Sequence, residues 1–215
     1  MIYEKIKSQI IHGELLPGTF LSERAFANEL KVSRTPVRAA IKQLAQDGWV
    51  NLEEHKRAVV SEITEKDVVE LFLLREMIEP FAIRKIMECG KPALLAGMLA
   101  TIANEMDGYK DDYVALMEKD MRFHSEIVNF AGIEKLSMIW QKLSDQMLRV
   151  SIYVMHPKRL PEDVLKEHRV IIDALWNVDI SKALASLQAH HNNTFNAYKI
   201  RHFYESGLKV KVSVQ

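Results

Sequence analysis

The 215-residue sequence has one cysteine, no long hydrophobic run and no net charge. Cys89 cannot form an intramolecular disulfide, and a lone cysteine fits a reducing compartment. The opening stretch MIYEKIKSQIIHGELLPG lacks the apolar region of a signal peptide, and the most apolar stretch, around residues 93–103, is too short to span a bilayer. We therefore expect a cytoplasmic protein with one or two domains and no membrane partner.

Charge is balanced over the whole chain but not along it. The 29 basic residues equal the 29 acidic residues, so the total argues neither for nor against an acidic partner. Residues 22–42 nevertheless carry five cations and two anions, a local charge of +3. The cations are Arg24, Lys31, Arg34, Arg38 and Lys42.

Three of these cations fall on one expected helix, SRTPVRAAIKQLAQDG, at residues 33–48. Ser33 is a good N-cap residue, Pro36 fits the first turn, and Gly48 can adopt the left-handed conformation that ends a helix. The apolar side chains form one stripe, and Arg34, Arg38 and Lys42 lie about a third of a turn away from it. Alone, this pattern is also typical of a solvated charged face.

The surrounding segments favour DNA binding over a merely solvated face. Isoleucines recur every fourth residue over 2–10, and Ser22 begins a second helix that leads through a tight turn into the basic one. Two β-prone runs, 49–52 and 58–63, flank a charged segment and predict a hairpin. This order is typical of a winged helix-turn-helix, whose second helix contacts base edges in the major groove.

The rest of the chain is expected to be helical. Apolar periodicity and helix boundary residues predict helices over 64–89, 92–107, 111–130, 133–155, 161–177 and from 180 past 198. We expect a mainly α protein: a winged helix-turn-helix domain at 1–62, an all-α helical bundle at 63–205, and a tail at 206–215. The tail alternates like a strand, and no role is assigned to it.

Four residues of the helical half could hold a divalent ion. Asp120 and His124 are four residues apart and project from one helix face, while His168 and His190 lie on the last two helices. Carboxylate and imidazole ligands from three helices would leave coordination positions for water or a ligand. A pair such as Asp120 and His124 is more often a surface pair. His191 points about 100° away from His190, as polar surface or as a residue behind the ligands.

The N-terminal segment IKSQIIHGELLPGTFLSERAFANELKVSRTPVRAAIKQLAQDGWV resembles the DNA-binding domain of the GntR superfamily of bacterial transcription regulators. The resemblance covers nearly all of residues 6–50. It implies DNA contacts by Arg24, Ser33, Arg34, Thr35 and Arg38, and by His55 and Lys56 at the tip of the wing. The wing segment 53–57 lacks the glycine that is usual in the family.

The segments LREMIEP, DMRFH, EHRVIIDAL and ALASLQAH resemble the C-terminal FCD-type helical domain of the FadR-like branch. In metal-containing members, the ligand positions correspond here to Asp120, His124, His168 and His190. The resemblance implies a divalent metal ion, with zinc first and nickel, manganese or iron as alternatives. It also implies a small organic or sugar acid as the effector.

The candidate effector anchors are two arginines. Arg75 projects from the first helix of this domain and is the stronger candidate, although a surface ion pair with Glu79 explains it nearly as well. Arg149 has the weaker claim.

Together these features predict a repressor that is a homodimer and binds a palindromic double-stranded operator under control of a small carboxylate effector. The alternatives are a metal-dependent helical enzyme that acts on a small carboxylate and a metal-free sensor of the acyl-CoA type. An enzyme would give the DNA-binding half no evident purpose. An intact metal ligand set disfavours the acyl-CoA sensor.

Overall fold

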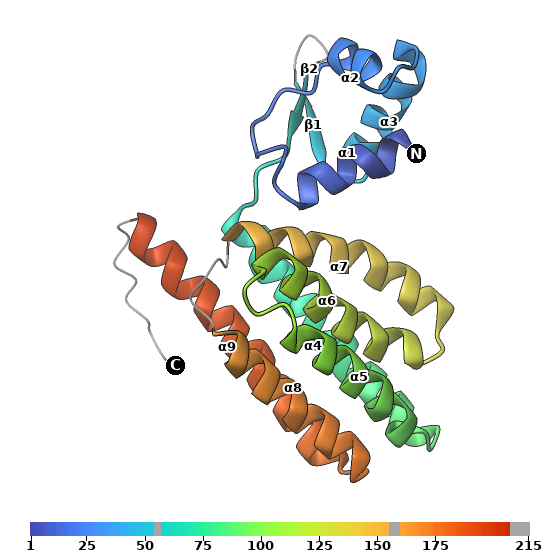
Figure 1. Ribbon diagram of the computed structural model, residues 1–215, viewed down its shortest axis with the longest axis vertical. Helices are drawn as coiled ribbons and strands as arrows, with labels where there is room; N and C mark the ends of the chain where they lie inside the picture. The colour runs from blue at the N-terminus through green and yellow to red at the C-terminus, as the bar shows by residue number, and fades with distance from the viewer. Residues whose placement is uncertain (54–56, 155–159, 207–215) are drawn as a thin grey trace. The chain divides into compact units, whose positions relative to one another are not determined.

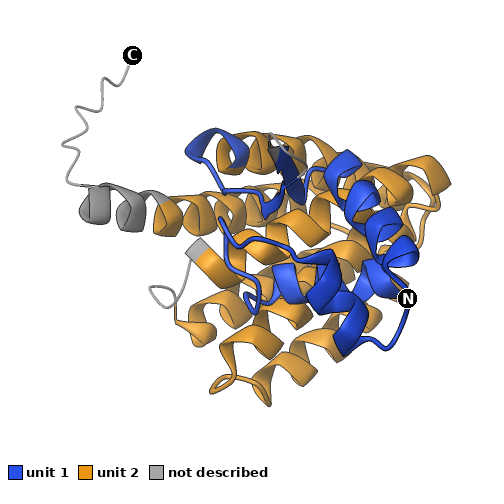
Figure 2. Cartoon of the chain, turned by 90° about the horizontal axis from the view of Figure 1, so that it is seen from above, with its two compact units in different colours: residues 1–67 blue, residues 68–215 orange. Residues whose placement is uncertain are grey.

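The computed structural model describes residues 1–53, 57–154 and 160–206, which contain nine helices and two strands. The chain divides into two compact units, Met1–Asp67 and Val68–Gln215 (Figure 2). No helix in the described ranges is long and apolar enough to cross a membrane. The wing tip with His55 and Lys56, and the strand-like end of the tail, lie outside the described residues.

The first unit has the element order of a winged helix-turn-helix (Figure 1). Its elements are α1 (Ile2–Ile11), α2 (Glu23–Glu29), α3 (Arg34–Gln46), β1 (Val50–Glu53) and β2 (Arg57–Val60). The two strands are antiparallel, with Val50 opposite Val60, and an isolated bridge joins Phe20 to Val59. The expected winged helix-turn-helix is therefore confirmed.

Local sequence accounts for where α2 and α3 begin and end. The Ser22 hydroxyl accepts a hydrogen bond from the Ala25 amide at 3.2 Å and caps α2. Gly48 follows α3 with φ +81°, a conformation that favours glycine. The expectation that the Ser33 hydroxyl caps α3 is wrong: Ser33 is the N-cap residue, but its side chain makes no capping hydrogen bond.

The apolar stripe of α3 is the core of this unit. Val37, Ile41 and Leu44 are buried, and they face the buried Ile6 and Ile10 of α1. Because α3 packs through this stripe, its cationic stripe lies on the solvent side. The core thus positions the candidate DNA-contacting residues.

The second unit is a bundle of six helices (Figure 1). They are α4 (Glu65–Glu88), α5 (Pro92–Asp107), α6 (Tyr113–Phe130), α7 (Glu134–Val154), α8 (Pro161–Trp176) and α9 (Ile180–Ser206). Helix α6 packs against α5 and α7, and α8 packs against α5 and α9. The expected mainly α fold is confirmed, and each predicted helix lies within a few residues of its observed bounds.

Boundary residues explain most helix starts in the bundle. Proline is the first residue of α5 and of α8, where its missing N–H costs nothing. Asp112 caps α6 by accepting from the Ala115 amide at 3.1 Å, and Thr64 and Asp67 bond reciprocally at the start of α4. These starts set the rotation of α6 and α8, and hence the direction in which their polar side chains point.

Replacing Gly48 tests the end of α3. Gly48→Ala should lower the free energy of unfolding by about 1 kcal/mol, because alanine is strained at positive φ. No heavy atom lies within 4 Å of the position a Cβ would take, so a clash cannot contribute. Gly48→Asn, which tolerates this backbone conformation, should cost less in the same urea unfolding experiment. An equal loss in both variants would contradict this explanation.

Candidate DNA-binding surface and metal centre

Four cations of the first unit line one cleft. The cleft has a volume of about 700 Å³ and includes residues of α2, α3 and the two strands. Its cationic lining residues are Arg24, Arg34, Arg38 and Lys42. All four side chains are exposed, so a phosphate or a base edge can reach them. Lys42 was not among the predicted DNA contacts, although the sequence places it on the same stripe.

Arg38 is held by Glu23 before any DNA is bound. Its Nη2 lies 2.8 Å from Glu23 Oε2 and its Nε 2.9 Å from Oε1, a bidentate pair between α3 and α2. The hydrogen bond raises the pKa of Arg38 and lowers the pKa of Glu23. The Arg38 side chain is still 60% exposed. Glu23 therefore fixes the direction of the guanidinium while leaving it open to solvent.

The other predicted contacts lie near the start of α3 or on α2. Ser33, Arg34 and Thr35 are exposed at the N-terminus of α3, where backbone N–H groups favour an anion. Arg24 is exposed on α2. The cleft brings Arg24 and Arg34 together with Arg38, whereas its lining does not include Ser33 or Thr35.

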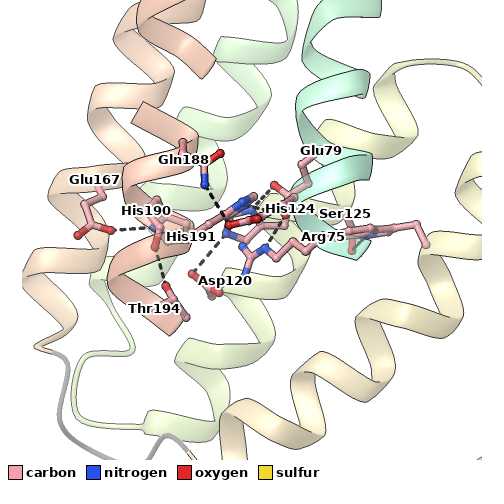
Figure 3. Close-up of polar contacts among 12 residues, drawn as sticks. Arg75, Glu79, Asp120, His124, Ser125, Glu167, Gln188, His190, His191 and Thr194 are labelled. Atoms are coloured by element: carbon pink, nitrogen blue, oxygen red, sulfur yellow. Dashed lines mark hydrogen bonds and ion pairs between the residues drawn. The ribbon is translucent and has the colours of Figure 1, made fainter. Parts of the chain in front are cut away.

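In the second unit, the four predicted metal ligands converge. Asp120 and His124 come from α6, His168 from α8 and His190 from α9. One ligand atom of each lies within 4.8 Å of the others, and all four residues are buried. The interpretation of Asp120 and His124 as a surface pair is thus wrong, because the bundle encloses both. Figure 3 shows Asp120, His124 and His190 of this cluster together with the neighbouring Arg75 and Glu79.

Several ligand atoms in this cluster have no hydrogen bond. Asp120 Oδ1 lies 3.2 Å from His168 Nε2 and 3.9 Å from His124 Nε2. None of these three buried atoms has a hydrogen-bond partner. Buried polar atoms are normally satisfied, so an acceptor-rich group of this kind fits a cation.

The charge states also fit a cation. Burial raises the pKa of the Asp120 carboxyl, but His168, His124 and Arg75 outweigh it and lower the pKa below its usual range. Burial and Arg75 lower the pKa of His124 to about 4. Near neutral pH, Asp120 is therefore ionised and His124 is neutral, the forms that coordinate metals.

Two carboxylates orient the histidines from behind. His124 donates from Nδ1 to Glu79 Oε2 at 2.7 Å, and His190 donates from Nδ1 to Glu167 Oε2 at 2.9 Å. Each bond places Nε2 as the ring nitrogen toward the cluster and fixes the tautomer. The sequence prediction missed both carboxylates, although Glu79 had been weighed as a partner of Arg75.

Glu79 is the centre of a second buried cluster. Arg75 Nε donates to Glu79 Oε1 at 2.6 Å, and His191 Nε2 donates to the same oxygen at 3.2 Å. Glu79, His124 and His191 also satisfy the spacing of a metal site. We favour the Asp120 cluster, because both Glu79 oxygens already accept hydrogen bonds. The surface interpretations of Arg75 and His191 are wrong, since both residues are buried.

A small cavity borders the Asp120 cluster. Its lining includes Arg75, Asp120 and Thr194, together with Tyr113 and Ser151. Its volume of about 30 Å³ suits only one or two water molecules. Arg75 Nη2 is buried without a hydrogen-bond partner in this region. Arg149 is also buried, but the described cavity lining does not include it.

Comparison with known families assigns each unit. Residues 1–60 match the bacterial regulatory proteins of the gntR family, and residues 70–193 match the FCD domain. A gluconate operon transcriptional repressor of Bacillus licheniformis is 32% identical over 87% of this chain and 79% of its own length. That of Bacillus subtilis is 29% identical over the same shares. Both resemblances noted in the sequence are confirmed.

A solved structure, Escherichia coli McbR/YncC, has the same fold. It superposes with a TM-score of 0.77, covers 94% of this chain and 96% of its own, and is 17% identical. At that identity the likeness concerns the arrangement of elements alone.

Truncation of Arg38 tests the cleft. Arg38→Ala should weaken binding to the preferred DNA sequence by about 10- to 100-fold and relax base preference, because a bidentate donor is lost. Folding should be nearly unchanged. The measurement is a gel-shift titration at fixed salt, with Lys5→Ala on α1 as a control that removes an exposed cation outside the cleft. Unchanged affinity for Arg38→Ala would exclude it from recognition.

Proposed function

We propose that this chain, which belongs to the gntR family of bacterial regulatory proteins, carries an FCD domain and is a DNA-binding transcriptional regulator, is a repressor. Its operator binding is controlled by a small organic or sugar acid. The acid binds beside a divalent metal ion held by Asp120, His124, His168 and His190. The single observation that carries this proposal is the convergence of these buried residues, in which Asp120 Oδ1 and the Nε2 atom of each of the three histidines make no hydrogen bond.

Zinc fits the ligand set best. Imidazole nitrogens and one carboxylate suit zinc, and nickel, manganese and iron are the alternatives. When bound, the metal would supply positive charge to which an effector carboxylate can coordinate. The chain's own part is to present deprotonated ligands in fixed directions. Glu79 and Glu167 support this role by orienting His124 and His190.

The effector class is supported by the groups around the small cavity. Arg75 lines it beside Asp120, and its buried Nη2 can donate to a second carboxylate or hydroxyl oxygen. Relatives named for the gluconate operon act on genes of a sugar acid, which fits the same chemistry. Arg149 stays a prediction as an effector contact.

The two halves divide the work in this proposal. Residues 1–62 bind DNA through the cleft, and residues 63–205 bind metal and effector and pair two chains. A two-fold homodimer requires an operator with matching symmetry, so we propose a palindromic site. Arg24, Ser33, Arg34, Thr35 and Arg38 contact it, with His55 and Lys56 proposed at the wing tip.

The alternatives fit the site less well. The nearby carboxylates Glu79 and Glu167 are engaged in holding histidines, which suits binding rather than the activation of water. A long acyl chain would need an apolar tunnel, whereas the lining of the small cavity includes the charged residues Arg75 and Asp120. Sensing of a small polar acid is therefore the better match.

Removing two ligands separates a sensor from an enzyme. His124→Ala with His168→Ala should give a protein that lacks metal by elemental analysis but still binds operator DNA. It should lose its response to gluconate, the probe acid. In the native protein, operator DNA should change gluconate affinity by about 5- to 150-fold in calorimetry, since coupling between two ligands is reciprocal. Asp120→Asn, which keeps the side-chain volume, is the milder second variant.

Two results would contradict the sensor. One is a native affinity for gluconate that ignores operator DNA; the other is chemical consumption of the acid that stops in the double variant. Circular dichroism of each variant checks that a lost response does not reflect unfolding.

Glu167→Gln tests the metal ligands through a carboxylate that accepts hydrogen bonds from His190 and Asn193. An amide accepts the His190 proton less strongly, so zinc affinity should fall by about 10- to 100-fold. The control is Glu162→Gln, the same change at an exposed site on α8. Competition with a chromophoric zinc chelator measures both. Equal affinities in the two variants would remove Glu167 from the site.

A further inference from the structure

Helix α4 has two faces of different character. Its inner face is buried and supplies Arg75 and Glu79 to the metal centre. Its outer face is apolar at the middle and exposed: Leu73 is 54% exposed, Met77 69% and Phe81 46%. Contiguous exposed apolar side chains of this size mark interaction surfaces. Charged residues flank the apolar centre at both ends of the helix.

We propose that this outer face of α4 pairs with the same face of a second copy, antiparallel, with Met77 on the two-fold axis. The inference rests on the homodimer of the proposed function and assigns its surface. It also places the pairing surface on the helix that supplies Arg75 and Glu79.

Helix geometry places the relevant residues on one stripe. Seven residues make about two turns, so Glu70 and Arg84 lie on the same face as Met77, each about 10 Å along the axis from it. Leu73 and Phe81 lie one turn on either side of Met77. When one copy is reversed around Met77, Leu73 of each copy therefore meets Phe81 of the other.

The charges select the reversed arrangement. In an antiparallel pair centred on Met77, Glu70 of one copy faces Arg84 of the other, and this happens twice by symmetry. Farther out, Lys66 faces Glu88 in the same way. A parallel pair in register would instead place each charged residue opposite its own copy. In the antiparallel pair, opposite charges meet at both pairs of positions. This complementarity favours a second, antiparallel copy as the partner that covers the α4 face.

The pair of Glu70 with Arg84 should contribute more to the free energy of dimerisation than the pair of Lys66 with Glu88. Glu70 and Arg84 border the apolar centre directly, where water is more fully excluded. The decisive substitutions therefore fall on Glu70 and Arg84.

Charge reversal tests the pairing. Glu70→Arg places cations opposite Arg84 at two symmetric sites, and Arg84→Glu does the same with anions. Each single variant should raise the dimer dissociation constant by about 100-fold in sedimentation equilibrium, because like charges at an interface are costly. Glu70→Arg combined with Arg84→Glu should restore most of the dimer. The control is Glu118→Arg, the same change at an exposed position of α6, which should leave the dimer intact.

A cysteine at the axis tests the register. In a Cys89→Ser background, Met77→Cys places two thiols at the two-fold axis, and mild oxidation should give a covalent dimer. Met98→Cys on α5, which is also partly exposed, should not cross-link.

Each other outcome would overturn the proposal. A native dimer that both single variants leave unchanged places the pairing surface elsewhere, while the proposed function stands. A double variant as weak as the single ones excludes the pair of Glu70 with Arg84. A monomeric native protein would overturn both this pairing and the homodimer of the proposed function.

Discussion

The bundle depends on how one buried carboxylate is balanced. Asp120 is ionised and enclosed among three imidazoles, and an isolated buried charge of this kind costs several kcal/mol. The positive charge of the Arg75 guanidinium acts on Asp120, but Arg75 is itself bound to Glu79. These residues come from α4 and α6, with His168 on α8 and His190 on α9. The packing of four helices is therefore tied to the electrostatic state of one site.

Helix α4 connects this site with the solvent-facing surface of the unit. Turning α4 by a fraction of a turn would move Arg75 and Glu79 against His124, and it would move Leu73, Met77 and Phe81 at the same time. Side chains in a packed interior shift together because the interior has few voids. A ligand bound beside Arg75 could in this way alter how two chains pair and hence the spacing of their DNA-binding units. The coupling needs no separate relay between the metal centre and DNA.

Local sequence predicts the helices well, and it predicts that Asp120 and His124 share one helix face, for physical reasons that can be named. Helix starts depend on capping residues and prolines, and Asp120 and His124 are neighbours on any helix. By contrast, Glu79 with His124, Glu167 with His190 and Glu23 with Arg38 join different helices, and no periodicity indicates which carboxylate reaches which partner. The sequence also did not predict which polar residues are buried. His191 and Arg75 lie inside the bundle, where both donate hydrogen bonds to Glu79. The match to family motifs supplied the ligand positions on α8 and α9, which spacing alone could not.

The size of the small cavity beside Asp120 bears on the rates at which an effector would bind and leave, rather than on its affinity. At about 30 Å³ it cannot admit a six-carbon acid in this conformation, so under the proposed function the acid would enter only when side chains or helices separate. Association would then proceed at the rate at which the bundle opens, well below the diffusional encounter rate, and the closed bundle would slow escape as well. A sensor built in this way responds to a sustained change in concentration and averages over brief fluctuations.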